Sequence, residues 1–462
     1  MRKALTALIA ISLVVSITPV QAAVKVGDKC TVLGQKKSAN GKDFTCVQSG
    51  KKLVWNKGIV VAPADLAPQP SPEKLATCQI KDQRPSGQYW EAIAYPISNF
   101  NRESKLPITG TAKVAFIPID FSDVPGKGNP LVFGQTQIDA ANEWLAWYTN
   151  GKLKYEWQTH NSWIRAPKPS TQYNWAHPVH GGYQGQKTPQ AQSTEEIIQQ
   201  LVTAASPYFN FEGVGAVFLL FPKEVKAIEL EITRRNDTWQ TAQGPQRFSF
   251  FGPGAEINNR GDQLWGWWIH EVLHSHGFAG HSPFGFLNLH MMIGGWQSSA
   301  LSSWDALSAG WTNEEDIYCL SKERVTKTKL TLSPLDRKQK GLKSVMIKLN
   351  DHQVLVFESR RPEKWSSSQL DVNGLMSYIV DTKKVTDREG ESAGEERERT
   401  ATYLTTDQRK EMGSNLFAGC NRTRCDRTMI YARAGQTFTF DGIKVTLTKS
   451  GVNDEILLEK IS

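Results

Sequence analysis

The spacing of apolar and polar positions changes twice along the chain, and the changes mark three regions. Between residues 24 and 58, short apolar runs alternate with Gly, Lys and turn residues, which predicts a small β module. Between residues 78 and 320, continuous apolar runs such as "KVAFIPIDF" and "GAVFLLF" alternate with helical patterns, which predicts a mixed sheet covered by helices. Residues 321–462 hold only short strand-like runs, among them "QVLVFESR" and "GLMSYIVD". The predicted fold class is therefore α+β, with a β-rich C-terminal region.

Three helices are predicted within the central region. Residues 136–148 carry apolar side chains at helical spacing. The segment "STEEIIQQLVTAA" begins with a capping box made by Ser193 and Glu196, and its apolar residues then follow one helix face. The segment "WGWWIHEVLHSHG", residues 265–277, predicts the third helix.

The first 22 residues have the three parts of a signal peptide. Arg2 and Lys3 give a positive start, residues 4–17 are an apolar run, and "PVQAA" offers a cleavage site after Ala22. An uncleaved membrane anchor is the alternative, but the run is short for one. We therefore expect a protein that is secreted or held in the cell envelope, with no membrane span after removal of the signal.

The segment at residues 59–77 is rich in Pro and Ala and predicts an extended linker. Two roles stay open for residues 24–75, a pro-segment that is removed or a binding module that is kept. The chain has 462 residues and a formal net charge of +8, which is mild for this length and predicts no nucleic-acid partner. Association with a cell wall or surface, for example with an anionic wall polymer, stays open.

Six cysteines are present, an even number that an exported protein would pair as disulfides. A cysteine metal site is the rival interpretation, but the chain contains no C-x-x-C pair. Spacing suggests three pairs: Cys30 with Cys46, Cys78 with Cys319, and Cys420 with Cys425.

The predicted helix at residues 265–277 carries the motif H-E-x-x-H. His270 and His274 lie four residues apart, so a helix places both imidazoles on one face, where they can reach one Zn²⁺. Glu271 could take a proton from an attacking water and pass it to a leaving amine. Gly277 is placed to end the helix.

The alternative for His270 and His274 is a pair of ordinary core histidines. Two observations oppose it. The neighbouring Trp, Ile, Val and Leu residues make a buried helix, in which unpaired imidazoles are costly. Five of the nine histidines also fall between His270 and His290. A metal site is therefore the favoured interpretation.

The third ligand is less determined by the sequence. The metzincin pattern H-E-x-x-H-x-x-G-x-x-H would place it at residue 280, which is Gly280 here, and His281 comes one position later. Because the chain leaves the helix at Gly277, it could absorb one extra residue, and His281 is our choice. His276 points away from the pair on an ideal helix and is assigned a supporting role. Outside candidates remain open: His290, Asp305, Glu314, Glu315 and Glu358.

Together with the motif, the segment "FLNLHMMIGGWQSSALSSWDALSAGW" resembles the immune inhibitor A family of secreted bacterial zinc metalloproteases. Upstream, "KVAFIPIDFSD" looks like the opening strand of that family, with its trailing Asp123. The resemblance runs from about Lys113 to Asp381 and is patchy between blocks. The matching positions after the helix are Met291, Gly294, Trp296, Leu301, Ser302, Trp304, Gly310 and Trp311.

This resemblance implies a zincin-like catalytic domain over residues 78–320 and endopeptidase chemistry. It implies that His270 and His274 bind zinc, that Glu271 is the general base, and that Met291 forms a Met-turn beneath the metal. The family usually reads "GLPD" after the second histidine, whereas this chain reads "GFAGH". A structural Ca²⁺ of the family type would need ligands supplied by the fold, since no D-x-D-x-D-G loop is present.

The predicted function is hydrolysis of protein or peptide substrates by a secreted zinc endopeptidase. The alternative is a surface or wall-binding protein whose peptidase-like domain is inactive. A zinc hydrolase that acts on a non-peptide bond is a further alternative.

Overall fold

The structure is a computed structural model, and it divides the chain into two compact units, Met1–Pro68 and Gln69–Ser462. It describes residues 25–39, 42–57, 59–60, 69–83, 106–173, 192–228, 231–258, 261, 264–278, 301–338, 340–361, 374–384, 401–411 and 431–461. The predicted signal peptide, the Cys420–Cys425 pair, His281, His290 and Met291 lie outside these residues. No helix among the described residues is long and apolar enough to cross a membrane.

The N-terminal unit is a small antiparallel sheet. Its strands are β1 (Lys36–Ala39), β2 (Lys42–Ser49), β3 (Lys52–Trp55) and β4 (Ile59–Val60); β2 pairs with each of the other three. The predicted disulfide Cys30–Cys46 is confirmed. Among its described residues, the buried core holds Phe44, Cys46 and Trp55, so the disulfide supplies stability that so small a core cannot.

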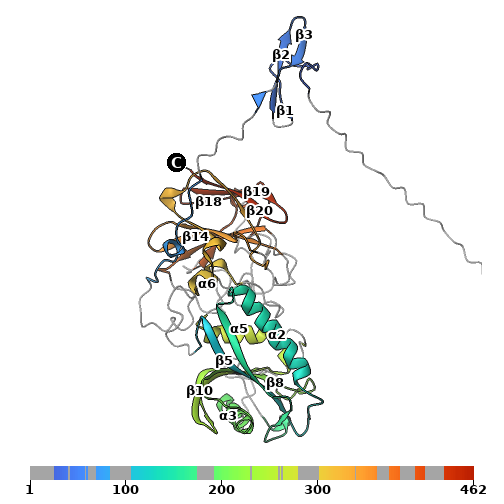
Figure 1. The fold of residues 1–462 in the computed structure, drawn as a ribbon, viewed down its shortest axis with the longest axis vertical. Coiled ribbons are helices and arrows are strands. Elements are labelled where there is room, and N and C mark those ends of the chain that lie inside the picture. Colours follow the sequence, from blue (N-terminus) through green and yellow to red (C-terminus); the bar gives the residue numbers. More distant parts are fainter. Residues whose placement is uncertain are drawn as a thin grey trace, which may run out of the picture. The chain divides into compact units, whose positions relative to one another are not determined.

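The first part of the second unit is a mixed sheet with the strand order β6-β5-β8-β10-β9, and Figure 1 labels β5, β8 and β10 of this sheet. β5, β6, β8 and β10 are parallel, and β9 runs antiparallel to β10 at the edge. A short strand, β7 (Ile164–Arg165), also pairs with β5. The bounds are β5 Gly110–Asp120, β6 Leu153–Thr159, β8 Val214–Leu220, β9 Ile232–Thr241 and β10 Gly244–Gly252.

Helices cover both faces of this sheet because its central strands are apolar on both sides. Val114 and Phe116 of β5 face α2 (Leu131–Tyr148) and α5 (Leu264–Ser275). The intervening residues of β5 face α3 (Thr194–Ala205). α3 begins with the predicted capping box, in which Ser193 and Glu196 satisfy each other's backbone N–H groups.

The second part of the main unit is a sandwich of two sheets. The first has the order β11-β13-β14-β15-β16, with β17 also on β15, and the second has the order β12-β20-β19-β18. Apolar side chains of both sheets, such as Phe357 and Phe438, form the core between them. The bounds are β11 Ile317–Ser321, β12 Thr328–Leu332, β13 Ser344–Lys348, β14 Gln353–Arg360, β15 Gly374–Asp381, β16 Ala401–Tyr403, β17 Tyr431–Ala432, β18 Thr437–Phe440, β19 Ile443–Ser450 and β20 Asp454–Lys460.

Two short helices, α1 (Leu75–Cys78) and α6 (Ser303–Ser308), pack on the outer face of the first sheet. The predicted disulfide Cys78–Cys319 is confirmed and ties α1 to β11. α1 crosses the boundary predicted at residue 77, where the linker was expected to end, and β11 crosses the boundary predicted at residue 320. The other short helices are α4 (Ala255–Asn258) and α7 (Asp407–Glu411).

α6 joins the two parts of the main unit. Its Trp304 and Leu307 pack on the sandwich, while Ala306 belongs to the core beneath α2 and α5. The Tyr148 hydroxyl of α2 donates a hydrogen bond to the Ser302 carbonyl, 2.8 Å away. The fold is therefore α+β, and the helix with the H-E-x-x-H motif lies on one face of its mixed sheet (Figure 1).

Candidate metal centre

Helix α5 is held in place by its aromatic and aliphatic residues. Trp268 packs against Phe218 and Phe116 of the sheet, with ring centroids 5.3 and 5.7 Å apart. The neighbouring Trp267, Ile269, Val272 and Leu273 are at most 1% exposed. Burial of each such side chain contributes about 1.5–3 kcal/mol relative to exposure. The predicted helix is thus confirmed. Because its apolar residues are buried, the helix cannot rotate, and the orientation of its histidines is set.

His270 and His274 lie one turn apart on α5. Their ring centroids are 5.0 Å apart and their planes are nearly perpendicular, at 87°. They are 4% and 7% exposed. The Glu271 carboxylate lies beside them, with Oε1 3.7 Å from His270 Nε2, and its side chain is 13% exposed. The motif therefore gathers two imidazoles and one carboxylate at one turn of the helix.

A backbone carbonyl determines the tautomer of His274. His274 Nδ1 lies 2.6 Å from the Phe278 carbonyl oxygen. A carbonyl can only accept, so Nδ1 carries the proton and the lone pair of the neutral ring lies on Nε2. Metal-binding histidines commonly donate their second ring nitrogen to a carbonyl in this way.

The end of α5 explains why that carbonyl is available. Gly277 has φ +107°, a backbone conformation that favours glycine. The Phe278 N–H donates to the Leu273 carbonyl at 3.0 Å, and the Gly277 N–H donates to the His274 carbonyl at 3.1 Å. These two bonds form a Schellman motif, which turns the chain back over the last turn. Gly277 ends the helix as predicted, and the turn brings Phe278 to His274.

His276 is bound on both ring nitrogens. Its Nδ1 lies 2.8 Å from the Pro107 carbonyl, and its Nε2 lies 2.8 Å from the Tyr155 hydroxyl, which donates to it. Burial lowers the pKa of His276 to about 4, although the bond to Pro107 opposes the shift. The ring stays neutral and has no nitrogen left for a metal. This agrees with the supporting role that the sequence assigned to it.

Among the described residues, no group of three or more His, Cys, Asp or Glu side chains could hold a metal ion. Asp305, Glu314 and Glu358 accept hydrogen bonds elsewhere, from the backbones of Ser302, Leu75 and Ser303. No described acid thus joins His270 and His274 as a third ligand. His281 and His290 lie outside the described residues, so the assignment of His281 stays a prediction.

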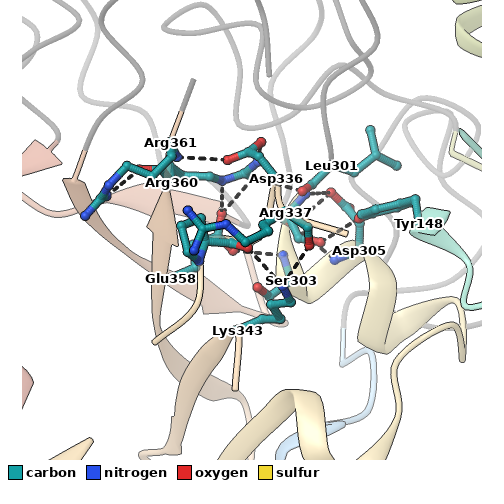
Figure 2. Close-up of polar contacts among 12 residues, drawn as sticks. Tyr148, Leu301, Ser303, Asp305, Asp336, Arg337, Lys343, Glu358, Arg360 and Arg361 are labelled. Carbon is teal, nitrogen blue, oxygen red and sulfur yellow. Dashed lines mark hydrogen bonds and ion pairs between the residues drawn. The ribbon is translucent and has the colours of Figure 1, made fainter. Parts of the chain in front are cut away.

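A buried ionic network on β14 involves one of these acids, Glu358, and was not predicted from the sequence. Figure 2 shows Arg360 between Glu358 and Asp336, with Nη2 and Nη1 at 2.7 and 3.1 Å from the carboxylate oxygens. Arg360 Nη2 also donates to the Leu301 carbonyl at 2.8 Å. Glu358 in turn accepts from the Ser303 backbone at 2.8 Å. This network ties α6 and the chain before it to the sandwich.

The second guanidinium on this strand end, that of Arg361, pairs with buried Asp454 of β20. The Asp454 carboxylate also accepts from the Ser359 hydroxyl at 2.7 Å. Burial raises the pKa of Asp336, although the neighbouring Arg360 guanidinium opposes the shift. The sequence signal for this network is an S-R-R run that follows an apolar strand, where a buried arginine requires acidic partners.

Asp123, which the family resemblance singled out, has a structural role. It accepts hydrogen bonds from the backbone N–H groups of Ser170 and Thr171, at 2.6 and 3.2 Å, and from both hydroxyls. The slight burial of this exposed side chain would raise its pKa, but these bonds outweigh burial and lower the pKa to about 2. The side chain thereby holds the 3₁₀ turn at Ser170–Gln172.

An open hollow lies elsewhere, between the end of α2, α6 and the start of β13. Asn150, Ser303 and Lys343 are among its lining residues, and none of the lining residues belongs to α5. It is therefore separate from the H-E-x-x-H turn.

Comparison with protein-family models gave no match, and comparison with curated proteins gave no significant match.

Proposed function

We propose that the chain is a secreted zinc-dependent endopeptidase. The observation that carries the proposal is the arrangement on α5, where two imidazoles lie one turn apart and the His274 tautomer leaves its neutral lone pair on Nε2. This donor set suits Zn²⁺, with His270 and His274 as two ligands. His281 is proposed as the third.

When bound, zinc would polarise the scissile carbonyl and lower the pKa of an attacking water. Glu271 takes the proton of that water and delivers it to the leaving amine. Its carboxylate lies beside His270 and is partly exposed, which supports this role. Met291 is proposed to lie beneath the metal. A helix on the face of a mixed sheet is compatible with a zincin-like domain.

The edge of the sheet supports a peptide as substrate. β9 ends the described sheet and pairs only with β10 among the described strands, and α5 packs against both strands. An edge strand can bind an extended peptide through its backbone N–H and C=O groups. At Gln240 the Gln199 side chain of α3 already bonds to both of these groups, so a peptide would pair with the rest of β9. A substrate bound there would lie along the same sheet that supports α5.

The decisive variant is Glu271→Gln, which preserves the shape of the side chain and removes its basicity. We expect turnover of a denatured protein substrate to fall by about 10²–10⁴-fold, while zinc content stays at the wild-type level. A matched control is His160→Gln, since His160 packs against Tyr208 away from α5 and should keep full activity.

Equal cleavage by wild type and Glu271→Gln would refute the mechanism. Purified protein that binds no stoichiometric zinc, even after zinc is added, would favour the surface-binding alternative. Loaded protein that cleaves esters or amidated sugars but no peptide would favour a non-peptide zinc hydrolase.

A further inference from the structure

The positive charge of the chain is concentrated in the N-terminal unit. Residues 25–60 contain eight Lys and two Asp, with no Arg or Glu, and so carry +6 of the net charge of +8. Arg2 and Lys3 account for the other two charges. Residues 61–462 therefore balance, with 44 basic and 44 acidic side chains. The net charge of the whole chain is mild, but one segment of 36 residues is strongly basic.

The lysines of this segment are available to a partner. Six of the seven whose side chains are described are exposed, and Lys37 is half-buried. No ion pair is recorded for any of these seven among the described residues. The exposed lysines are Lys25, Lys29, Lys36, Lys51, Lys52 and Lys57. Repulsion among so many like charges costs stability in the absence of an anion, and a bound polyanion would relieve it.

The two faces of the N-terminal sheet differ: one forms the core of the unit and the other carries lysines. Phe44, Cys46 and Trp55 occupy one face and form the core. Lys36 lies opposite Thr45, and Lys52 lies opposite Ser49. Because alternate residues of β2 point to opposite faces, Lys36 and Lys52 share the face turned away from that core.

The side chains of the unit favour one kind of polyanion. Its two aromatic residues, Phe44 and Trp55, are only 5% and 7% exposed. They cannot stack on nucleobases or anchor in a bilayer interface. Lysine is a compact point charge and lacks the planar fork with which arginine reads a base edge. The large exposed apolar residues in the described part of the unit are the aliphatic Val26, Val32 and Leu33.

We propose that the N-terminal unit binds a linear polyol-phosphate polymer of the cell envelope, through its exposed lysines and without reading a sequence. Each lysine contacts one phosphate as a point charge, and binding releases the counterions of the polymer. Because the two units belong to one chain, this binding would hold the main unit at a high local concentration beside the polymer. This proposal does not depend on peptidase activity.

The test uses the full mature chain and immobilised poly(glycerol phosphate) as the probe. The variant Lys36→Gln/Lys51→Gln/Lys52→Gln removes three charges from the N-terminal unit. The matched control, Lys154→Gln/Lys329→Gln/Lys338→Gln, removes three charges from exposed lysines of the main unit. Circular dichroism and disulfide titration check that both variants fold.

We expect the first variant to bind on the order of 100-fold more weakly at low salt. The slope of log affinity against log salt should fall by about 2, since roughly 0.7 counterions are released per contact with a single chain. The control should bind as the wild type does. Equal losses in the two variants, or no binding by wild type, would overturn the proposal. Tighter binding at equal phosphate concentration to duplex DNA or to phosphatidylglycerol vesicles would also overturn it.

Discussion

Among the charged and titratable groups that the main unit buries, those on α5 and those at the end of β14 are satisfied in different ways. At β14, Arg360 is enclosed by Glu358, Asp336 and the Leu301 carbonyl, so protein groups supply its partners. On α5, a helix end fixes one nitrogen of His274 and gathers a second imidazole and a carboxylate at the same turn. The first arrangement stabilises a junction, whereas the second is suited to an ion from outside the chain.

The largest expected effect on stability concerns the first of these places. Arg360→Met should lower the free energy of unfolding by about 3–5 kcal/mol, because it leaves Glu358 and Asp336 buried without their cation. Denaturant unfolding measures it. The matched control is Arg234→Met, which breaks a partly exposed pair with Glu195 and should cost less than about 1 kcal/mol. Equal losses of unfolding free energy in the two variants would contradict the distinction between a buried network and a partly exposed ion pair.

Removal of the metal is expected to have the next largest effect on stability. If zinc binds at α5, a chelator should lower the free energy of unfolding by about 3 kcal/mol when the free zinc it removes was about 100 times the Kd. In His274→Ala, the same chelator should change nothing. A chelator effect of equal size in that variant would place the stabilising metal elsewhere.

A smaller effect links the helix end to the metal. Gly277→Ala should cost about 1 kcal/mol or more, because alanine is strained at φ +107°. It should also weaken zinc binding by about 10–100-fold through the displaced Phe278 carbonyl. Zinc titration and denaturant unfolding measure the two effects.

Gly310→Ala is the control for that variant. Gly310 has φ +74° and ends α6 with the same pair of backbone bonds, from Trp311 to Ala306 and from Gly310 to Leu307. It should cost similar stability and leave zinc affinity unchanged. Equal zinc loss in both variants would show that general destabilisation, not the Phe278 contact, controls the metal.

The smallest expected effect concerns Asp123, a carboxylate that belongs neither to α5 nor to the end of β14. Its folded pKa of about 2 lies below the ordinary value of 3.8, so it contributes stability that is present above pH 3.8 and lost as pH falls towards 2. Asp123→Asn should therefore reduce the steepness of acid unfolding in that window. Asp139→Asn, at an exposed position of α2, should not. An unchanged acid profile in Asp123→Asn would show that solvent screens the contribution.

Much of the fold was predictable because local patterns carry it. β14 and β15 have the bounds of the runs "QVLVFESR" and "GLMSYIVD", and α3 begins at its predicted capping box. The hairpin of β9 and β10 was missed, since its strands mix charged and aromatic residues without clean alternation. α1 was missed within a Pro-rich segment because contacts with the sandwich, rather than propensity, order it.

The sequence by itself determined the helix with its motif and the glycine that ends it, because these depend on spacing or on a single conformational preference. It only suggested the two disulfide pairs that the structure confirms. Only the tertiary structure showed which groups are the partners of the buried polar side chains. His274 and His276 are only two residues apart in the same helix segment. In the structure, His274 bonds to the Phe278 carbonyl through one ring nitrogen, whereas His276 bonds to Tyr155 and Pro107 through both. The partners of a buried polar group come from distant segments, and packing, which no local pattern encodes, brings them together.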